Sequence, residues 1–458
     1  MNKGMSFYKV GMIGLLILAL MIPLMMINGL IQDRQSRRDE VVEDIARSSS
    51  YSQHISGPLL IVPYRKLTRI WKLNAESRER YQETVEEKGR LYFLPERFEL
   101  DGKVQTEVRS RGIYEARLYH ADNTLSGQFV LPEHFGLGND FENYRFDAPF
   151  LAVGITDVRG IESALKLDLN GEQLDFVPGT DVALLGEGVS VVLPLETGVE
   201  QKRLNFAFDL RLQGTGQLQI TPVGKSSVVR VAADWPHPSF IGNYLPASRD
   251  VSGQGFTANW QTSFFATNLQ EILNRCSSSE VCTEFAGRSF GVSFISPVDQ
   301  YLKSDRSIKY ALLFITLTFA GFLLFEVLKG LAVHPVQYAL VGASLALFYL
   351  LLLSLSEHLG FTLAYVLSAS ACVALIGFYV CHVLDSVRHG LSFGVALGIL
   401  YALLYGLLGA EDYALLMGAL LLFGVLGVFM VLTRKLDWYA LAQRPAKPAA
   451  LVAEVGHE

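Results

Sequence analysis

The chain has 458 residues, of which 50% are hydrophobic and 18% are charged, and its formal net charge is −6. A chain of this length can hold one or two soluble domains together with a bundle of membrane helices. Nucleic-acid binding usually needs a basic face, and this acidic chain contains no polybasic arm. We therefore expect no nucleic-acid partner.

The first element is an apolar segment without charged side chains between residues 10 and 31. At about 1.5 Å per residue, a helix of this length crosses a ~30 Å hydrocarbon core. A cleaved signal peptide is the alternative, but the apolar run is longer than a usual signal core and no A-x-A site follows it closely. We expect an uncleaved anchor over residues 1–31, continued by a charged helix from Arg34 to Arg47.

A polar region over residues 32–308 follows, and from residue 57 to about 293 its dominant period is two. Leucine and phenylalanine alternate with polar residues from Arg203 to Gln213, which predicts a strand with one buried face. The dipeptide Asn170-Gly171 lies between two short alternating runs and predicts a two-residue hairpin. We expect a large β-rich domain, built as an antiparallel sandwich.

Two further elements are expected in the same region. Gly214 and Gly216 indicate a second hairpin between Leu212 and Leu218. Residues 261–275 are expected to form a helix.

Charges nearly vanish between residues 311 and 433, where five further apolar segments occur. Each segment is long enough to cross a bilayer as a helix. We expect these spans at residues 311–329, 337–355, 361–384, 391–409 and 413–432. The predicted fold is thus an α+β membrane protein with an N-terminal transmembrane helix, a β-rich domain, a five-helix transmembrane bundle and a tail over residues 434–458.

The short connections between spans predict the orientation. Those that follow the second, fourth and sixth spans contain Lys329, Arg388 and Arg434, whereas the alternate connections contain neither lysine nor arginine. By the positive-inside rule, both termini lie in the cytoplasm and residues 32–308 lie outside, in the periplasm of a Gram-negative host. Three arginines between residues 34 and 38 argue for the reverse, but long translocated domains largely escape the rule.

Few motifs point to chemistry. The chain has no G-x-x-x-x-G-K-[ST] and no H-E-x-x-H. The G-x-S-x-G match around Ser392 opens a predicted membrane helix, so helix packing explains it better than catalysis. His382, Asp385 and His389 share one helix face and could hold a divalent metal, but an exposed interfacial face is the more common arrangement. We predict no catalytic, cofactor or metal site, and we expect Glu326 to pair with Lys329 three residues later.

Two features of the outside domain are candidate sites. Trp235, His237, Phe240 and Tyr244 are candidate partner-binding residues, because rigid aromatic side chains are typical of recognition surfaces. The alternative, which we favour, is a structural corner with its aromatic rings in the core. Cys276 and Cys282 flank a short polar loop and predict a local disulfide in an oxidising compartment, with two independent thiols as the alternative.

Several longer motifs resemble the CreD family, the cell-envelope-integrity inner-membrane proteins of Gram-negative bacteria. These motifs occur in order along essentially the whole chain, at residues 234–240, 255–260, 297–301, 305–306, 309–310, 334–338, 348–353, 356–361 and 437–439. The resemblance implies an inner-membrane protein whose expression is tied to a two-component regulator and whose loss or gain alters envelope properties. It implies no established enzymatic activity or ligand.

We therefore expect a non-enzymatic protein of the envelope stress response, anchored in the lipid bilayer, whose outside domain binds an envelope partner. The alternative is a membrane enzyme or transporter that acts on a lipid or cell-wall intermediate. It predicts a polar cavity that reaches Glu357, His358 or Glu411. A sensory partner for a kinase, acting through the cytoplasmic tail, is a third possibility.

Overall fold

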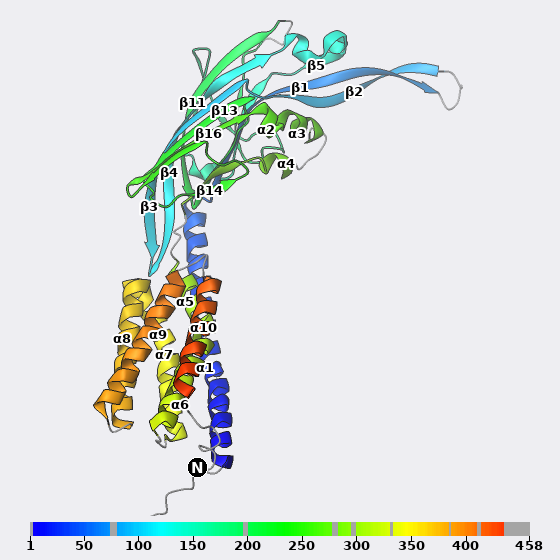
Figure 1. Ribbon diagram of the computed structural model, residues 1–458. Coiled ribbons are helices and arrows are strands. Elements are labelled where there is room, and N and C mark those ends of the chain that lie inside the picture. Colours follow the sequence, from blue (N-terminus) through cyan, green and yellow to red (C-terminus); the bar gives the residue numbers. More distant parts are fainter. Residues whose placement is uncertain are drawn as a thin grey trace, which may run out of the picture. The chain divides into compact units, whose positions relative to one another are not determined.

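The computed structural model describes residues 3–73, 80–195, 200–276, 283–294, 299–329, 333–383, 386–409 and 414–434 (Figure 1). The chain forms two compact units. One contains residues Met1–Arg37 and Val298–Glu458, and the other contains Arg38–Pro297. An N-terminal apolar helix, a large β-sheet domain and C-terminal apolar helices confirm the expected α+β membrane fold.

Helix α1 (Lys3–Ser48) is one continuous helix that contributes residues to both units. The prediction that the charged segment from Arg34 to Arg47 continues the anchor is confirmed. Pro23 lies inside the helix, which a membrane helix tolerates because neighbouring groups can satisfy the freed carbonyl.

The membrane unit continues with α5 (Gln300–Lys309), α6 (Ala311–Lys329), α7 (Pro335–Leu359), α8 (Phe361–Val383), α9 (Val387–Gly409) and α10 (Ala414–Thr433). Among the described residues, four helices are long and apolar enough to cross a membrane, namely α1, α7, α8 and α9. Helices α5 and α6 are bent by 46° and count as a fifth if taken together, whereas the apolar part of α10, Leu416–Val428, is shorter. The expected total of six spans stays a prediction.

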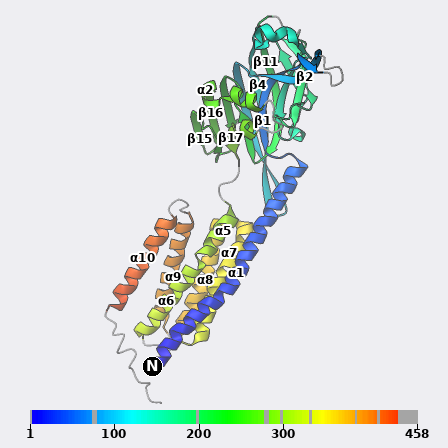
Figure 2. The same ribbon diagram turned by 90° about the vertical axis from the view of Figure 1, so that its right-hand side faces the viewer.

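Helices α8 and α9 (Figure 2) pack against each other, and glycines of both helices lie at their contact. A Cβ built on Gly390 would lie 2.7 Å from the Cα of Cys381, and one built on Gly394 would lie 3.9 Å from the Cα of Gly377. Small residues let membrane helices approach each other in this way. The glycines of the G-x-S-x-G match are therefore packing residues.

The β unit contains two sheets whose buried side chains belong to one continuous hydrophobic core. The nine-stranded sheet has the order β14-β17-β12-β1-β6-β10-β9, with β2 and β5 also paired to β1. Its strands are β1 (Gln53–Leu73), β2 (Arg80–Phe93), β5 (Tyr144–Phe146), β6 (Phe150–Ile155), β9 (Val177–Pro178), β10 (Gly188–Val192), β12 (Gln217–Thr221), β14 (Ser239–Gly242) and β17 (Phe290–Ser293).

The eight-stranded sheet has the order β15-β16-β13-β3-β4-β11-β7-β8. Its strands are β3 (Arg97–Arg111), β4 (Tyr114–Leu131), β7 (Lys166–Leu169), β8 (Glu172–Asp175), β11 (Lys202–Thr215), β13 (Ser226–Ala233), β15 (Ser248–Ser252) and β16 (Gly255–Ser263). Most strand pairs are antiparallel, as expected, but β1 with β12 and β3 with β13 are parallel. Side-chain alternation alone cannot distinguish these two directions.

Local sequence signals in this sheet are confirmed. In β11 the residues Leu204, Phe206, Phe208, Leu210 and Leu212 are buried, and the residues between them face outward. Strands β7 and β8 pair across Asn170 and Gly171, whose φ values of 52° and 92° fit the expected positive-φ hairpin turn.

The hairpin predicted around Gly214 and Gly216 is wrong. Strand β12 does not return along β11 but lies between β1 and β17 in the other sheet. Gly216, with a φ of 77°, turns the chain from one sheet into the other, a conformation that glycine adopts without steric cost.

The helix predicted over residues 261–275 is only partly correct. Strand β16 continues to Ser263, and two short helices follow it, α2 (Phe264–Thr267) and α3 (Leu269–Cys276). Asn268 separates them in the left-handed conformation, with a φ of 48°. A helix α4 (Thr283–Ala286) follows.

Candidate functional site

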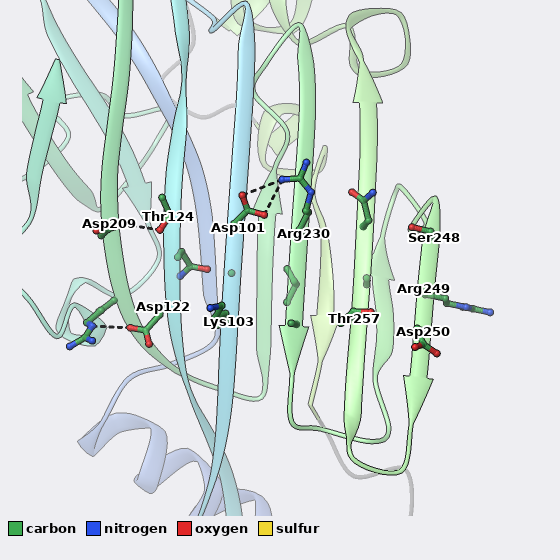
Figure 3. Close-up of a pocket in the computed structure, with 17 residues that line it drawn as sticks. Asp101, Lys103, Asp122, Thr124, Asp209, Arg230, Ser248, Arg249, Asp250 and Thr257 are labelled. Atoms are coloured by element: carbon green, nitrogen blue, oxygen red, sulfur yellow. Dashed lines mark hydrogen bonds and ion pairs between the residues drawn. The ribbon is translucent and has the colours of Figure 1, made fainter. Parts of the chain in front are cut away.

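The outward face of the eight-stranded sheet carries two adjacent rows of polar side chains. Strand register aligns one row as Ser248, Asn259, Arg230, Asp101, Thr124 and Asp209. It aligns the next row as Asp250, Thr257, Ala232, Lys103, Asp122 and Arg211. These rows line an open hollow of about 1000 Å³, which we call the outer-face groove (Figure 3).

Most charged side chains in the groove are paired with each other. Arg230 Nη1 lies 3.1 Å from Asp101 Oδ1, and Arg211 Nε lies 2.8 Å from Asp122 Oδ1 (Figure 3). All four side chains are more than half exposed, so each pair contributes at most about 1 kcal/mol to stability. Their main consequence is that they fix the direction of long side chains along the groove.

Lys103 and Asp250 differ from these pairs. Among the residues that the structure describes, neither side chain makes a hydrogen bond or ion pair. They lie in the same row, separated by Thr257 and Ala232, and both line the groove. Two charges of opposite sign are thus available to a ligand above a floor of short side chains.

The candidate aromatic segment before β15 packs mostly inward. Trp235 is 7% exposed, and its Nε1 donates to the carbonyl oxygen of His237. Phe240 and Tyr244 are half-buried against the core, while His237 is exposed. The guanidinium of Arg249, in β15, lies 5.7 Å from the centre of the Phe240 ring. The segment therefore supports an edge of the groove, and partner binding by its aromatic side chains stays a prediction.

Other predicted sites lie partly outside the described residues. Cys282, Asp385 and Glu411 fall there, so the disulfide of Cys276 with Cys282 stays a prediction. Ser392 lies on α9, where its Oγ donates to the carbonyl of His389 in the same helix. The part of the chain that the structure describes contains no group of three or more histidine, cysteine, aspartate or glutamate residues able to hold a metal ion.

The membrane unit contains a buried carboxylate, Glu326, on α6. It is 4% exposed and pairs with Lys9 of α1. It also accepts hydrogen bonds from the hydroxyl of Tyr338, at 2.8 Å, and from the backbone N–H of Val333, at 3.2 Å. The side chain of Lys329, its expected partner, lies outside the described part of the chain.

A second carboxylate, Glu357, lies near the C-terminal end of α7 and is 10% exposed. It accepts a hydrogen bond from the hydroxyl of Tyr301, at 3.2 Å, and its Oε1 lies 3.7 Å from Nε of Arg34. Arg34 and Lys9 are both on α1, about 37 Å apart along the helix at 1.5 Å per residue. Helix α1 is thus held by an ion pair near each end of its membrane segment.

The enzyme or transporter alternative requires a polar cavity among the membrane helices, and the hollow described there is mainly apolar. A hollow of about 410 Å³ lies between α7 and α8, and most of its lining is apolar. Its polar lining groups come from Ser344, Ser354, Ser368 and Cys372, and neither Glu357 nor His358 lines it.

The groove residues could not be recognised from the sequence alone. Outward positions of single strands, such as Asp209 and Arg211, were visible as the polar half of an alternating pattern. Their assembly into rows depends on pairing among strands that lie far apart in the chain.

The chain is similar to known proteins over nearly its whole length. A family model described as inner membrane protein CreD matches residues 5–439. Inner membrane protein CreD of Escherichia coli (strain K12) is 38% identical over 444 residues, which cover 96% of each chain.

Solved structures show only remote likeness. Two structures of an M1 zinc metallopeptidase from Deinococcus radiodurans, one of them a substrate-bound mutant, are 13% and 12% identical. They cover 37% of this chain and 39% and 38% of theirs, each with a TM-score of 0.18, and such a likeness has no bearing on fold or function. The match to the family model and the relative from Escherichia coli are decisive, and the chain belongs to the CreD family of inner membrane proteins.

Proposed function

We propose that this envelope-associated inner membrane protein acts without catalysis, by binding an envelope partner in the outer-face groove while its membrane helices anchor it. The observation that carries the proposal is the groove itself. It extends across six strands, is lined by charged and small polar side chains, and is open. Concave surfaces with a few convergent polar groups are the usual places for ligand binding.

The proposed orientation places residues 32–308 in the periplasm and both termini in the cytoplasm. Its support is the distribution of lysine and arginine among the short connections of the membrane unit. In this orientation the groove lies in the compartment that contains the envelope components, and the role that we propose there is in envelope integrity and its stress response.

Binding suits the chemistry of the groove better than catalysis does. A general acid or base needs a titratable group directed at a substrate, free to exchange a proton. Here three of the four carboxylates have partners: Asp101 and Asp122 are bound to arginine guanidinium groups, and Asp209 accepts a hydrogen bond from Thr124. Only the Asp250 side chain, among the groove residues that the structure describes, is an unpaired carboxylate, so the groove offers no pair of free carboxylates for acid–base work. Such groups are suited to recognising polar partners.

Site-specific photo-crosslinking in cells tests the proposal. A photoreactive residue at Thr257, in the groove floor, is expected to give a discrete adduct. The same residue at Val177, which is 52% exposed on the edge strand β9 of the other sheet, is the matched control and is expected to give none. Ala232→Trp, which fills the floor next to Thr257, is expected to abolish the adduct. An adduct that persists in this variant, or equal adducts from both positions, would contradict the proposal.

A further inference from the structure

We propose that Lys103 and Asp250 are the two ends of a recognition slot for an extended polypeptide segment that carries both an acidic and a basic side chain. The inference rests on the proposed function and specifies the partner of the same groove. The acidic group of the segment binds Lys103, and its basic group binds Asp250.

Strand register sets the length of the slot. From β15 to β3 the row runs Asp250, Thr257, Ala232 and Lys103, which is three steps between neighbouring strands. Neighbouring strands lie about 4.8 Å apart, so the two ends are separated by roughly 14 Å. An extended chain rises about 3.3 Å per residue, so a segment whose charged residues lie about four positions apart spans this distance.

The floor of the slot admits a chain that lies across the strands. Ala232 and Thr257 have short side chains, and strand register places them directly between the two charged ends. Figure 3 shows Thr257 with Lys103 and Asp250. The neighbouring row presents the ion pair of Arg230 with Asp101 as one wall. A second hollow, of about 380 Å³, shares all four slot residues and continues along the same face.

Charge complementarity selects the class of partner. The groove lining contains four acidic residues (Asp101, Asp122, Asp209, Asp250) and four basic residues (Lys103, Arg211, Arg230, Arg249). A polyanion or a polycation would therefore meet as much repulsion as attraction. The 17 lining residues include no aromatic ring for a nucleobase to stack on, and an uncharged glycan would leave both free charges unused. A polypeptide of mixed charge satisfies both ends.

The ion pairs around Lys103 leave its ammonium group free to bind a ligand. Lys103 stands opposite Asp122 in the β3–β4 register, and an ion pair between them would close one end of the slot. Asp122 instead pairs with Arg211 on the far side, at 2.8 Å. Asp101, on the same strand as Lys103, is likewise held by Arg230.

Peptide binding to the full-length protein in lipid nanodiscs tests the slot. The probes are fluorescent acetylated and amidated peptides with one lysine and one glutamate separated by zero to six glycines, with all-lysine and all-glutamate peptides for comparison. We expect the mixed peptides to bind best when about three glycines separate the charges. Lys103→Glu and Asp250→Lys should each weaken this binding about tenfold, because reversing one charge turns attraction into repulsion.

The charge-swapped double variant, Lys103→Glu with Asp250→Lys, restores one charge of each sign and should recover most of the binding. Lys166→Glu is the matched control, since Lys166 is an exposed lysine on β7 of the same sheet and lies outside the groove. All these positions are exposed, so the variants are expected to fold.

The outcomes separate the slot from the wider proposal. No saturable binding of the mixed peptides, equal binding of the all-glutamate or all-lysine peptides, or single variants that bind like the wild type would overturn the slot. If the Thr257 adduct still forms in cells and is lost in Ala232→Trp, the proposed function stands without it. If neither the peptide binding nor the Thr257 adduct is observed, the slot and the proposed function are both overturned.

Discussion

Replacing Lys9 with methionine removes the positive partner of a carboxylate buried in the membrane unit. Glu326 is 4% exposed, and in this variant it would keep only two neutral donors, the Tyr338 hydroxyl and the Val333 N–H. Leaving one charge of a buried ion pair without its partner costs about 3–5 kcal/mol. We expect the docking of α1 on the bundle to weaken by that order.

A second substitution tests the cause. In Lys9→Met/Glu326→Gln the charge is gone, and the glutamine carbonyl still accepts from the Tyr338 hydroxyl. The double variant should therefore lie within about 1.5 kcal/mol of the wild type, the range for a changed hydrogen bond. A double-mutant cycle should then give a coupling of at least about 1.5 kcal/mol.

The assay measures how often α1 separates from α7. Leu20 of α1 contacts the position where a Cβ on Gly342 of α7 would lie. A cysteine at position 20 is covered by α7 while the helices are docked, so in the detergent-solubilised protein it reacts with a membrane-permeant maleimide faster when the helices open. A loss of 3 kcal/mol should accelerate labelling by roughly a hundredfold. Labelling of Lys9→Met at the wild-type rate, or a double variant that labels as fast as the single one, would refute the reasoning.

Three further predictions concern titration and helix packing. Burial lowers the pKa of His54 to about 4, so the unfolded chain binds more protons than the folded one between about pH 6.5 and 4. The β unit should lose about 2–3 kcal/mol over that interval in denaturant titrations, and His54→Gln should remove this loss. Partial burial favours neutral His120, but its hydrogen bonds to Glu107 and Glu162 outweigh burial and raise its pKa. Its contribution is therefore complete below about pH 6.5 and lost as the pH rises through the folded pKa, so His120→Gln should destabilise more at pH 6 than at pH 8. Gly390→Ala forces a Cβ against Cys381 and should lower Tm by several degrees, whereas Ser392→Ala, which removes only a bond within α9, should leave Tm unchanged.

The parts of the fold that depend on neighbouring residues could be predicted from the sequence. The alternation in β11 and the positive φ values of Asn170 and Gly171 are set locally, by the two faces of a strand and by the steric freedom of a turn. Gly216 marked a turn, but the destination of the following strand is decided by β1 and β17.

The interactions that depend on distant residues escaped prediction for the same reason. Lys9 and Glu326 are 317 positions apart, so spacing suggested a partner on the same helix as Glu326. The slot residues Lys103 and Asp250 lie on strands that meet only through β13 and β16. Hydropathy predicts which helices enter the membrane, but it does not indicate which charges hold them together.

The most direct test of the central claim is the labelling of Thr257→Cys by a membrane-impermeant maleimide. The rate in spheroplasts is compared with the rate in the purified protein, and Val177→Cys and the parent chain provide the references. We predict that both introduced cysteines label from outside, and that only Thr257→Cys labels several-fold more slowly in spheroplasts, because a partner covers the groove. The account would be contradicted if the labelling rate in spheroplasts, relative to that in the purified protein, were the same at both positions. It would also be contradicted if neither cysteine were labelled from outside.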